Sequence, residues 1–375
     1  MKNDRRALIS AAALACLPTL RTAAQAAPTM PAAAVAGLAN PLLLPAPAAQ
    51  TSNLSIMGAT DLPVFAPMLR DYQRQHPGVA IRYEEFSTQA LYQRAASPAS
   101  PGLADLLVSS SMDLQMQLVN DGHAQAHRSE HTAALPAWAH WRDEIFGFSY
   151  EPMVMAYDTR RYTPATAPAT RRQLLQMLRD PARPLDGRVG SYDLSGSGIG
   201  YLAATQDARY DDNAGALMAA LAANHARWVM HAGLLLDDIE HGRMALAYNV
   251  PGSYVQGRIA AGAPIGMVLP HDYTLVISRT AVIPRNAPNA PEARRFLDYL
   301  LSPRGQAVLA HESRILPIRT DVDRGAHPVG ALRPIALGPG LLVYQDRLKR
   351  ARFLEAWRAS MPERGGRAEN PADRR

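Results

Sequence analysis

The chain has 375 residues, a net charge of +6 and 47% hydrophobic residues, and Cys16 is its only cysteine. A chain of this length can bury a large core without disulfides or structural metals. No run of basic residues favours nucleic-acid binding. A single cysteine allows neither an intramolecular disulfide nor a cysteine-based zinc site.

Residues 1–26 have the pattern of a secretory signal peptide, which predicts export to the periplasm. A charged start precedes an apolar run over residues 7–20, and Ala-Gln-Ala at 24–26 supplies a cleavage site. The apolar run is too short to span a membrane. Arg5-Arg6 also fits a twin-arginine signal, so the general secretory and twin-arginine routes both stay open. Lipidation of Cys16 is the less favoured interpretation, because no leucine stands three residues before it.

Two terminal segments have compositions that do not favour a packed core. Residues 27–50 are rich in alanine and proline, which is typical of a tether or a disordered leader. Residues 361–375 are expected to form a flexible tail. The folded part then covers about 51–360, which is long enough for two lobes.

The first half of the folded part alternates strand and helix patterns. Strands are predicted at 53–57, 79–83 and 104–108. A helix begins at Asp61 and carries Phe65, Leu69 and Tyr72 at helical spacing, and further helices begin at Ser87 and at residue 112. This β-α-β-α-β order predicts a parallel sheet covered by helices on both faces.

A second set of elements follows. Strands are predicted at 150–157, 243–248, 265–270 and 274–278, and another β-α unit begins at residue 188. An amphipathic helix is predicted at 291–301. The chain is therefore expected to be an α/β protein with two sheets.

Four segments stand in a characteristic order behind the export signal. They are FAPMLRDYQRQHPGVAIRY at 65–83, ADLLVSSSMDLQMQLVNDGHAQ at 104–125, FGFSYEPMVMAYDT at 146–159 and APEARRFLDYLLSPRGQAVLA at 290–310. Together they resemble the periplasmic solute-binding proteins of ABC transporters, in the group that contains ferric-iron, phosphosugar and phosphoglycerate receptors. The resemblance covers roughly residues 54–320.

This resemblance implies a type II periplasmic binding protein fold, with two α/β lobes, two crossover strands and a central ligand cleft. The crossovers are expected near 153–157 and 269–278. Lobe one would comprise 51–152 plus 270–360, and lobe two 153–269. Binding would close the lobes by a hinge motion. The implied partners of this monomeric receptor are a small solute and an inner-membrane ABC permease, or a membrane sensor kinase to which the liganded protein is presented.

Four predicted strand ends carry hydroxyl or small residues just before a helix. They are Thr60; Ser87 and Thr88; Ser109, Ser110 and Ser111; and Ser195, Gly196, Ser197 and Gly198. Ligands of open α/β sheets lie outside the carboxyl ends of the strands, and helix N-termini offer free N–H groups and a partial positive charge. The four together predict an anion site, although for each alone N-capping is the favoured interpretation.

The loop at 195–200 does not fit the common catalytic or nucleotide-binding motifs. No Gly-Lys-Ser/Thr follows it, its glycines are spaced GxGxG rather than GxGxxG, and Ser197 lacks the GxSxG frame. We therefore expect no catalytic residue, no cofactor and no resident metal. An exported phosphatase stays open as the alternative enzyme, but it would need a metal cluster or a nucleophile with a partner.

A phosphorylated sugar or acid, the ligand class we expect, would also need a polar half-site. Candidates are Glu151, Asn249, His271 and Asp272, of which all but Asn249 lie beside a predicted crossover. Ferric iron is the competing ligand, because the ferric-binding relatives use tyrosines. This chain has no Tyr-Tyr pair, although Tyr248 and Tyr254 lie six residues apart. Tyr248 therefore joins the candidate ligand-binding residues.

Overall fold

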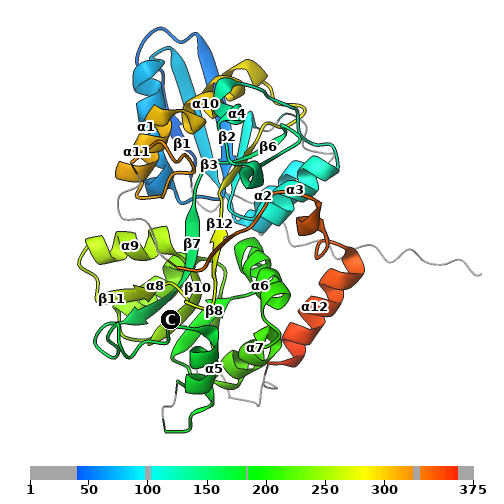
Figure 1. Cartoon of the computed structure of the whole chain (residues 1–375). Helices are drawn as coiled ribbons and strands as arrows, with labels where there is room; N and C mark the ends of the chain where they lie inside the picture. The colour runs from blue at the N-terminus through cyan, green and yellow to red at the C-terminus, as the bar shows by residue number, and fades with distance from the viewer. Residues whose placement is uncertain (1–39, 98–101, 103, 183–184, 324–329, 362–375) are drawn as a thin grey trace, which may run out of the picture.

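The computed structural model describes residues 40–97, 102, 104–182, 185–323 and 330–361. The predicted signal peptide, most of the Ala/Pro-rich segment and most of the predicted tail lie outside these residues. Figure 1 shows two α/β lobes, one above the other, which confirms the predicted two-lobed α/β fold. Among the described residues, no helix combines the length and the apolar character needed to cross a membrane.

Lobe one is built on a sheet with the strand order β1-β3-β2-β4-β13-β6-β5. Strands β2, β3 and β4 pair in parallel, as the β-α-β-α-β pattern predicts. The elements are β1 (Leu42–Leu44), β2 (Ser52–Gly58), α1 (Leu62–Gln75), β3 (Val79–Glu85), α2 (Thr88–Ala96), β4 (Leu106–Ser109), α3 (Met112–Asn120), α4 (Glu130–Ala133), β5 (His140–Trp141), β6 (Ile145–Gly147), β13 (Thr280–Val282), α10 (Ala290–Leu301) and α11 (Pro303–His311).

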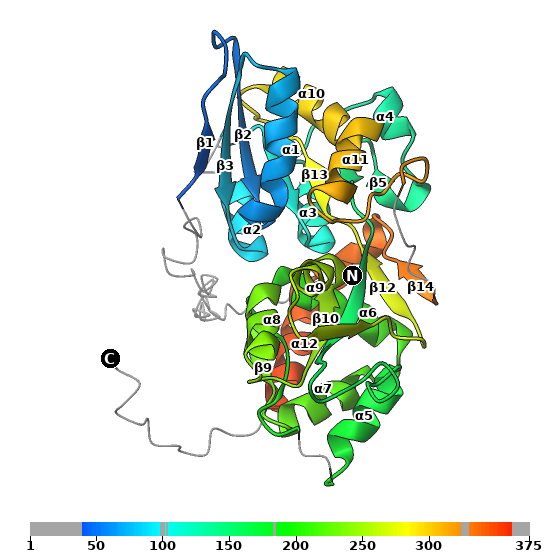
Figure 2. The same ribbon diagram turned by 90° about the vertical axis from the view of Figure 1, so that its left-hand side faces the viewer.

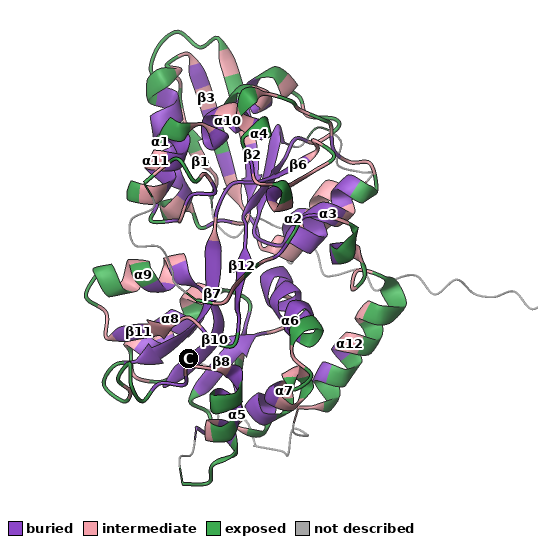
Figure 3. Ribbon diagram, in the orientation of Figure 1, coloured by how far each residue is buried: buried purple, intermediate pink, exposed green. Residues whose placement is uncertain are grey.

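Lobe two is built on a sheet with the order β14-β12-β7-β10-β8-β9, and β11 also pairs with β7. Strand β7 is buried along its whole length, and Figure 3 shows it at the centre of the molecule. The elements are β7 (Glu151–Asp158), α5 (Arg171–Arg179), β8 (Val189–Tyr192), α6 (Gly198–Tyr210), α7 (Ala214–Ala223), β9 (Arg227–Val229), α8 (Ala232–Glu240), β10 (Leu246–Pro251), α9 (Gly252–Ala260), β11 (Ile265–Val268), β12 (Thr274–Ile277), β14 (Leu332–Pro334) and α12 (Arg347–Ala359).

Helix α1 shows how local sequence determines an element of lobe one. Asp61 is its N-cap residue, and a proline occupies the first turn. Backbone N–H groups in the first turn have no partner within the helix, so the N–H that proline lacks costs no hydrogen bond. The predicted apolar face of Phe65, Leu69 and Tyr72 is fully buried. The helix ends at Gln75, before His76-Pro77.

The chain passes between the lobes at the N-terminal end of β7 and at the C-terminal end of β12. These two strands pair antiparallel, with Ile277 opposite Glu151, and β12 continues through Ser278 and Arg279 into β13 of lobe one. The first crossing therefore lies at the start of β7, before the predicted 153–157. Residues 274–277 belong to the sheet of lobe two, although the sequence-based division placed them in lobe one.

Two terminal segments differ from their predicted placement. Within the predicted leader, β1 pairs antiparallel with β3, because its leucines cover the edge of the core of lobe one. Helix α12, predicted in lobe one, packs on lobe two: Trp357 lies edge-on to Trp228, and Phe353 lies edge-on to Tyr201. Figures 1 and 2 both show α12 beside lobe two. Its position depends on aromatic contacts distant in sequence, which local patterns do not reveal.

Candidate functional site

A cavity of about 60 Å³, partly open to solvent, lies between the lobes. Its charged and polar lining comes from both of them. The lining includes Asp61, Glu85, Ser87, Thr88 and Ser110 from lobe one, Tyr192, Gly196, His231 and Tyr254 from lobe two, and Arg279 from the second crossover. We call this cavity the interlobe cleft.

Six helices begin at the interlobe cleft: α1, α2 and α3 from lobe one, and α6, α8 and α9 from lobe two. Residues at or next to their N-caps, such as Ser87 of α2, His231 of α8 and Pro251 of α9, line it directly. At α3, α8 and α9 the N-cap side chain accepts no hydrogen bond from the helix. Free N–H groups and the helix dipoles therefore make the cleft attractive to an anion.

The hydroxyl of Tyr192 is a buried donor without a protein partner among the described residues. Tyr192 is 1% exposed and lines the cleft. Burial raises the pKa of its hydroxyl, and Tyr254 and the charges of Asp61 and Glu151 add to this effect. A buried polar atom without a partner is costly unless something outside the protein pairs with it. This hydroxyl is therefore available to a ligand or a water molecule.

Arg279 is the only arginine among the described residues that lines the cleft, and its charge is already matched. Its Nε donates to Glu151 Oε1 at 2.6 Å and its Nη2 to Glu151 Oε2 at 3.3 Å, while Nη1 donates to Thr60 Oγ1 at 2.8 Å. Both partners of the ion pair are almost completely buried, with side chains 2% and 1% exposed. Burial lowers the pKa of Arg279, but the interactions with Glu151 and Tyr254 together outweigh it, so the net shift is upward. The guanidinium N–H groups not used in these bonds can donate to an anion.

Two carboxylates on the lobe-one side complete the charged lining. Asp61 Oδ1 accepts a hydrogen bond from the Tyr254 hydroxyl across the cleft at 2.8 Å. Glu85 Oε2 accepts one from the Leu62 backbone N–H at the start of α1, at 2.9 Å. Burial raises the pKa of Glu85; the Leu62 N–H opposes this shift and the Asp61 charge adds to it.

Only some of the predicted hydroxyl and glycine residues line the cleft. Ser87, Thr88, Ser110 and Gly196 do so. The Ser110 hydroxyl makes no hydrogen bond within the described part of the chain, so it is free to donate to a ligand. Thr88 Oγ1 accepts a hydrogen bond from the Gly198 N–H at 3.0 Å and so joins α2 of lobe one to α6 of lobe two.

The other predicted serines act within the protein. Ser197 accepts the Gly200 N–H as the N-cap of α6, Ser109 accepts the Ser111 N–H, and the Ser111 hydroxyl donates to Asp113. Ser195 is exposed, and its hydroxyl donates to Asp193 at 2.5 Å. For these residues the capping interpretation describes the structure better than direct ligand contact. Thr60 and Glu151 lie behind Arg279 and position it.

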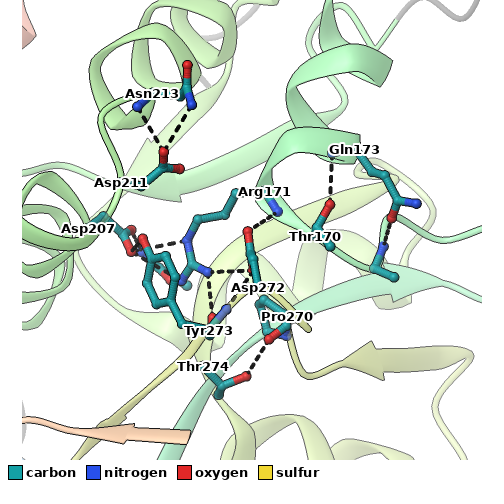
Figure 4. A network of polar contacts seen from close by, with 12 residues as sticks. Thr170, Arg171, Gln173, Asp207, Asp211, Asn213, Pro270, Asp272, Tyr273 and Thr274 are labelled. Carbon is teal, nitrogen blue, oxygen red and sulfur yellow. Dashed lines mark hydrogen bonds and ion pairs between the residues drawn. The ribbon is translucent and has the colours of Figure 1, made fainter. Parts of the chain in front are cut away.

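Tyr248, Asn249 and Asp272 belong to a separate network inside lobe two, shown in part in Figure 4. At its centre Arg171, 1% exposed, lies between Asp207 and Asp272. Arg171 Nε donates to Tyr248 Oη at 2.6 Å, and Nη1 donates to Asp272 Oδ1 at 3.1 Å. The Asn249 amide donates to Asp207 Oδ2 at 2.7 Å. The structure therefore places Tyr248 and Asn249 in the interior of lobe two and Asp272 at its surface, and none of the three lines the cleft.

His271, predicted with Asp272, is exposed beside this network, where its backbone N–H donates to the Ala169 carbonyl. Sequence reasoning also missed several lining residues, namely Asp61, Glu85, Tyr192, His231 and Arg279, and it considered Tyr254 only as a possible iron ligand. A usable signal existed for Arg279, which follows the predicted strand 274–278 directly at a crossover. Asp61 was recognised only as a helix cap.

Comparison with known proteins gives consistent results. The family model described as bacterial extracellular solute-binding protein matches residues 54–312. A substrate-binding protein of an ABC transporter from Agrobacterium tumefaciens is 32% identical, with a TM-score of 0.80, and the match covers 87% of this chain and 99% of that one. No curated protein matches the chain.

Two more distant solved structures share the fold. The periplasmic binding protein AfuA from Actinobacillus pleuropneumoniae, with exogenous fructose-6-phosphate bound, is 18% identical with a TM-score of 0.71, over 83% of this chain and 99% of that one. Iron-bound HitA from Pseudomonas aeruginosa is 20% identical with a TM-score of 0.64, over 83% of this chain and 99% of that one. At these identities the likeness extends to the fold alone.

Proposed function

Because this chain belongs to the family of bacterial extracellular solute-binding proteins, we propose that it captures a small phosphate-bearing anion in the interlobe cleft and delivers it to an ABC permease. The family and the fold neighbours are binding proteins rather than enzymes, and the chain is accordingly a receptor. The specific ligand, the periplasmic location and the permease partner are parts of the proposal.

The observation that carries the proposal is the unpartnered Tyr192 hydroxyl at a cleft where six helices begin. An anion there would accept hydrogen bonds from this hydroxyl, from Ser87 and Ser110, and from backbone N–H groups of both lobes. Donors from the two lobes would favour the closed arrangement when the anion is bound. No lysine is needed for such a site.

Ferric iron fits the cleft less well, although one fold neighbour is iron-bound. A trivalent cation would lie among helix N-termini, close to the buried guanidinium of Arg279. Iron-binding tyrosines act as phenolates, yet burial raises the pKa of both Tyr192 and Tyr254. Both effects count against Fe(III), even though the carboxylates of Asp61 and Glu85 line the same cleft.

Replacing Tyr192 by phenylalanine tests the site. We expect the affinity for phosphate esters to fall about 10-fold or more, because a hydrogen bond to a charged group contributes about 1.5–3 kcal/mol. Stability should not fall, since the hydroxyl has no protein partner to lose. Isothermal titration calorimetry against a panel of phosphate esters and denaturant unfolding measure the two quantities.

The matched control is Tyr210→Phe, because Tyr210 is 47% exposed and lies outside the cleft. It should leave affinity and stability unchanged. Tight Fe(III) binding by the wild type, with no response to any phosphate ester, would overturn the proposed ligand class.

Gly198→Ala tests whether closure of the lobes is required. A Cβ at this position would lie 2.6 Å from Ser111 Oγ and 2.7 Å from Thr88 Oγ1, both in lobe one. Overpacking of this kind costs about 1–3 kcal/mol, and here the cost falls on the closed state alone. We expect the affinity to fall about 10-fold while the stability of each lobe is kept.

Calorimetry gives the affinity of this variant, and small-angle X-ray scattering gives its dimensions at saturating ligand. Gly215→Ala, in α7 with no atom within 4 Å of the added Cβ, is the control. Unchanged affinity in Gly198→Ala would contradict the role of lobe closure.

A further inference from the structure

We infer that the ligand is a zwitterion, in which an ammonium group bound by Asp61 and Glu85 accompanies the anionic group. This inference rests on the proposed function, because it adds a second half-site to the same cleft. It distinguishes aminoalkyl phosphates and phosphonates from phosphorylated sugars and acids, which carry only negative charge.

Asp61 and Glu85 are carboxylates without a cationic partner. Neither takes part in an ion pair within the described ranges, and each has only one oxygen in a hydrogen bond. The remaining oxygens, Asp61 Oδ2 and Glu85 Oε1, are free to accept from a ligand. Both residues line the interlobe cleft, together with the unpartnered hydroxyl of Tyr192.

The arginine of the cleft does not balance these two charges. Arg279 is matched by Glu151 through two hydrogen bonds, so that pair is close to neutral as a unit. The side chains of the cleft therefore keep an excess of two negative charges on the lobe-one side. A ligand with only negative charge would be repelled by these two carboxylates when the lobes close, whereas an ammonium group would neutralise part of their charge.

The excess negative charge affects the pKa of Glu85. Burial and the neighbouring Asp61 charge raise its pKa, while the Leu62 N–H alone opposes them. The hydroxyl groups of a sugar could donate to these oxygens, but they would leave the repulsion between the carboxylates in place. A cation between them would relieve it.

Two aromatic residues, Phe86 and Tyr254, also line the cleft. Each ring already lies near an arginine guanidinium, with Arg94 5.7 Å from the centroid of Phe86 and Arg279 5.4 Å from that of Tyr254. The preference for an ammonium group therefore rests on the two carboxylates. The anionic group would then lie toward α2, α3 and α6, where Ser87, Ser110 and Gly196 line the cleft.

The test compares ligands that differ in one group. O-phosphoethanolamine is paired with 2-hydroxyethyl phosphate, and 3-aminopropyl phosphate with 3-hydroxypropyl phosphate, so that two spacer lengths are sampled. Calorimetry near neutral pH gives the four affinities. We expect the amine of at least one pair to bind about 10-fold or more tightly than its hydroxyl counterpart, as a charge-assisted contact does over a neutral one.

Isosteric variants show which residues cause the preference for the amine over the hydroxyl compound. Asp61→Asn keeps an oxygen for the Tyr254 hydroxyl, and Glu85→Gln keeps one for the Leu62 N–H. Each should reduce the preference for the amine several-fold, with little change in the affinity for the hydroxyl compound. The control is Glu84→Gln, because Glu84 pairs with Arg82 outside the cleft and should leave the preference intact.

The outcomes separate the inference from the proposed function. If the hydroxyl member of each pair binds as tightly as the amine, the zwitterion inference is wrong and the phosphate-binding function stands. If none of the four compounds binds and no other phosphate ester does, the proposed function is wrong and the inference falls with it. Equal loss of both ligand types in Glu85→Gln would also contradict a specific role for this carboxylate.

Discussion

Replacing Arg171 by methionine is expected to lower the free energy of unfolding by about 3–5 kcal/mol, the usual cost of leaving one member of a buried ion pair uncompensated. Arg171 is 1% exposed and lies between Asp207, 6% exposed, and Asp272, 28% exposed. Its guanidinium also lies 3.6 Å from the centroid of the Tyr273 ring. Methionine would fill the volume but leave the buried Asp207 carboxylate without its cation.

The network around Arg171 also lies at the base of the second crossover, so the substitution should affect the connection between the lobes. Tyr273 immediately precedes crossover strand β12, and its hydroxyl donates to Asp207 Oδ1 at 2.8 Å. Arg171 Nη1 also donates to the Tyr273 carbonyl at 2.6 Å. The network therefore anchors the base of the second crossover to α5 and α6 of lobe two.

Urea unfolding at neutral pH measures the cost, and Arg172→Met is the matched control because its neighbour Arg172 is exposed. The control should change stability by less than about 0.5 kcal/mol. Adding Asp207→Asn to Arg171→Met should recover part of the loss, since it removes the uncompensated charge. A loss below about 1 kcal/mol in Arg171→Met would show that this network is not a major source of stability.

The fold could be predicted because its signals are local. Alternating strands and helices, the apolar face of α1 and the order of the four characteristic segments are all readable within short windows. The sequence did not predict which elements far apart in the chain pack against each other. Helix α12 lies on lobe two because Trp357 meets Trp228, 129 positions earlier in the chain, and no local pattern encodes that contact.

The candidate site was predictable in part for the same reason. Ser87, Thr88, Ser110 and Gly196 lie at the carboxyl ends of strands, and that rule of α/β sheets brought them to the cleft. Arg279 follows the predicted strand 274–278 at a crossover, but this position alone does not show its pairing with Glu151, 128 positions away. Asp272 lies beside a crossover, as predicted, but its carboxylate pairs with Arg171 of lobe two and does not line the cleft.

Replacing Arg279 by methionine is expected to affect both folding and binding. The side chain of Glu151 is 1% exposed and would keep only hydroxyl donors, from Ser149 and Ser253. The expected loss of stability is again about 3–5 kcal/mol. Under the proposed function, the affinity for phosphate esters should also fall about 10-fold or more, because a buried cation is removed from the anion site.

A double variant separates these two effects. Arg279→Met combined with Glu151→Leu replaces the buried ion pair by apolar side chains, which is often neutral or stabilising, so the stability should return to within about 1 kcal/mol of the wild type. The affinity should stay low, because the guanidinium donors remain absent. Arg285→Met, at an exposed arginine, is the control and should change neither quantity. Recovery of ligand affinity together with stability in the double variant would show that Arg279 supports the fold of the cleft without contacting the ligand.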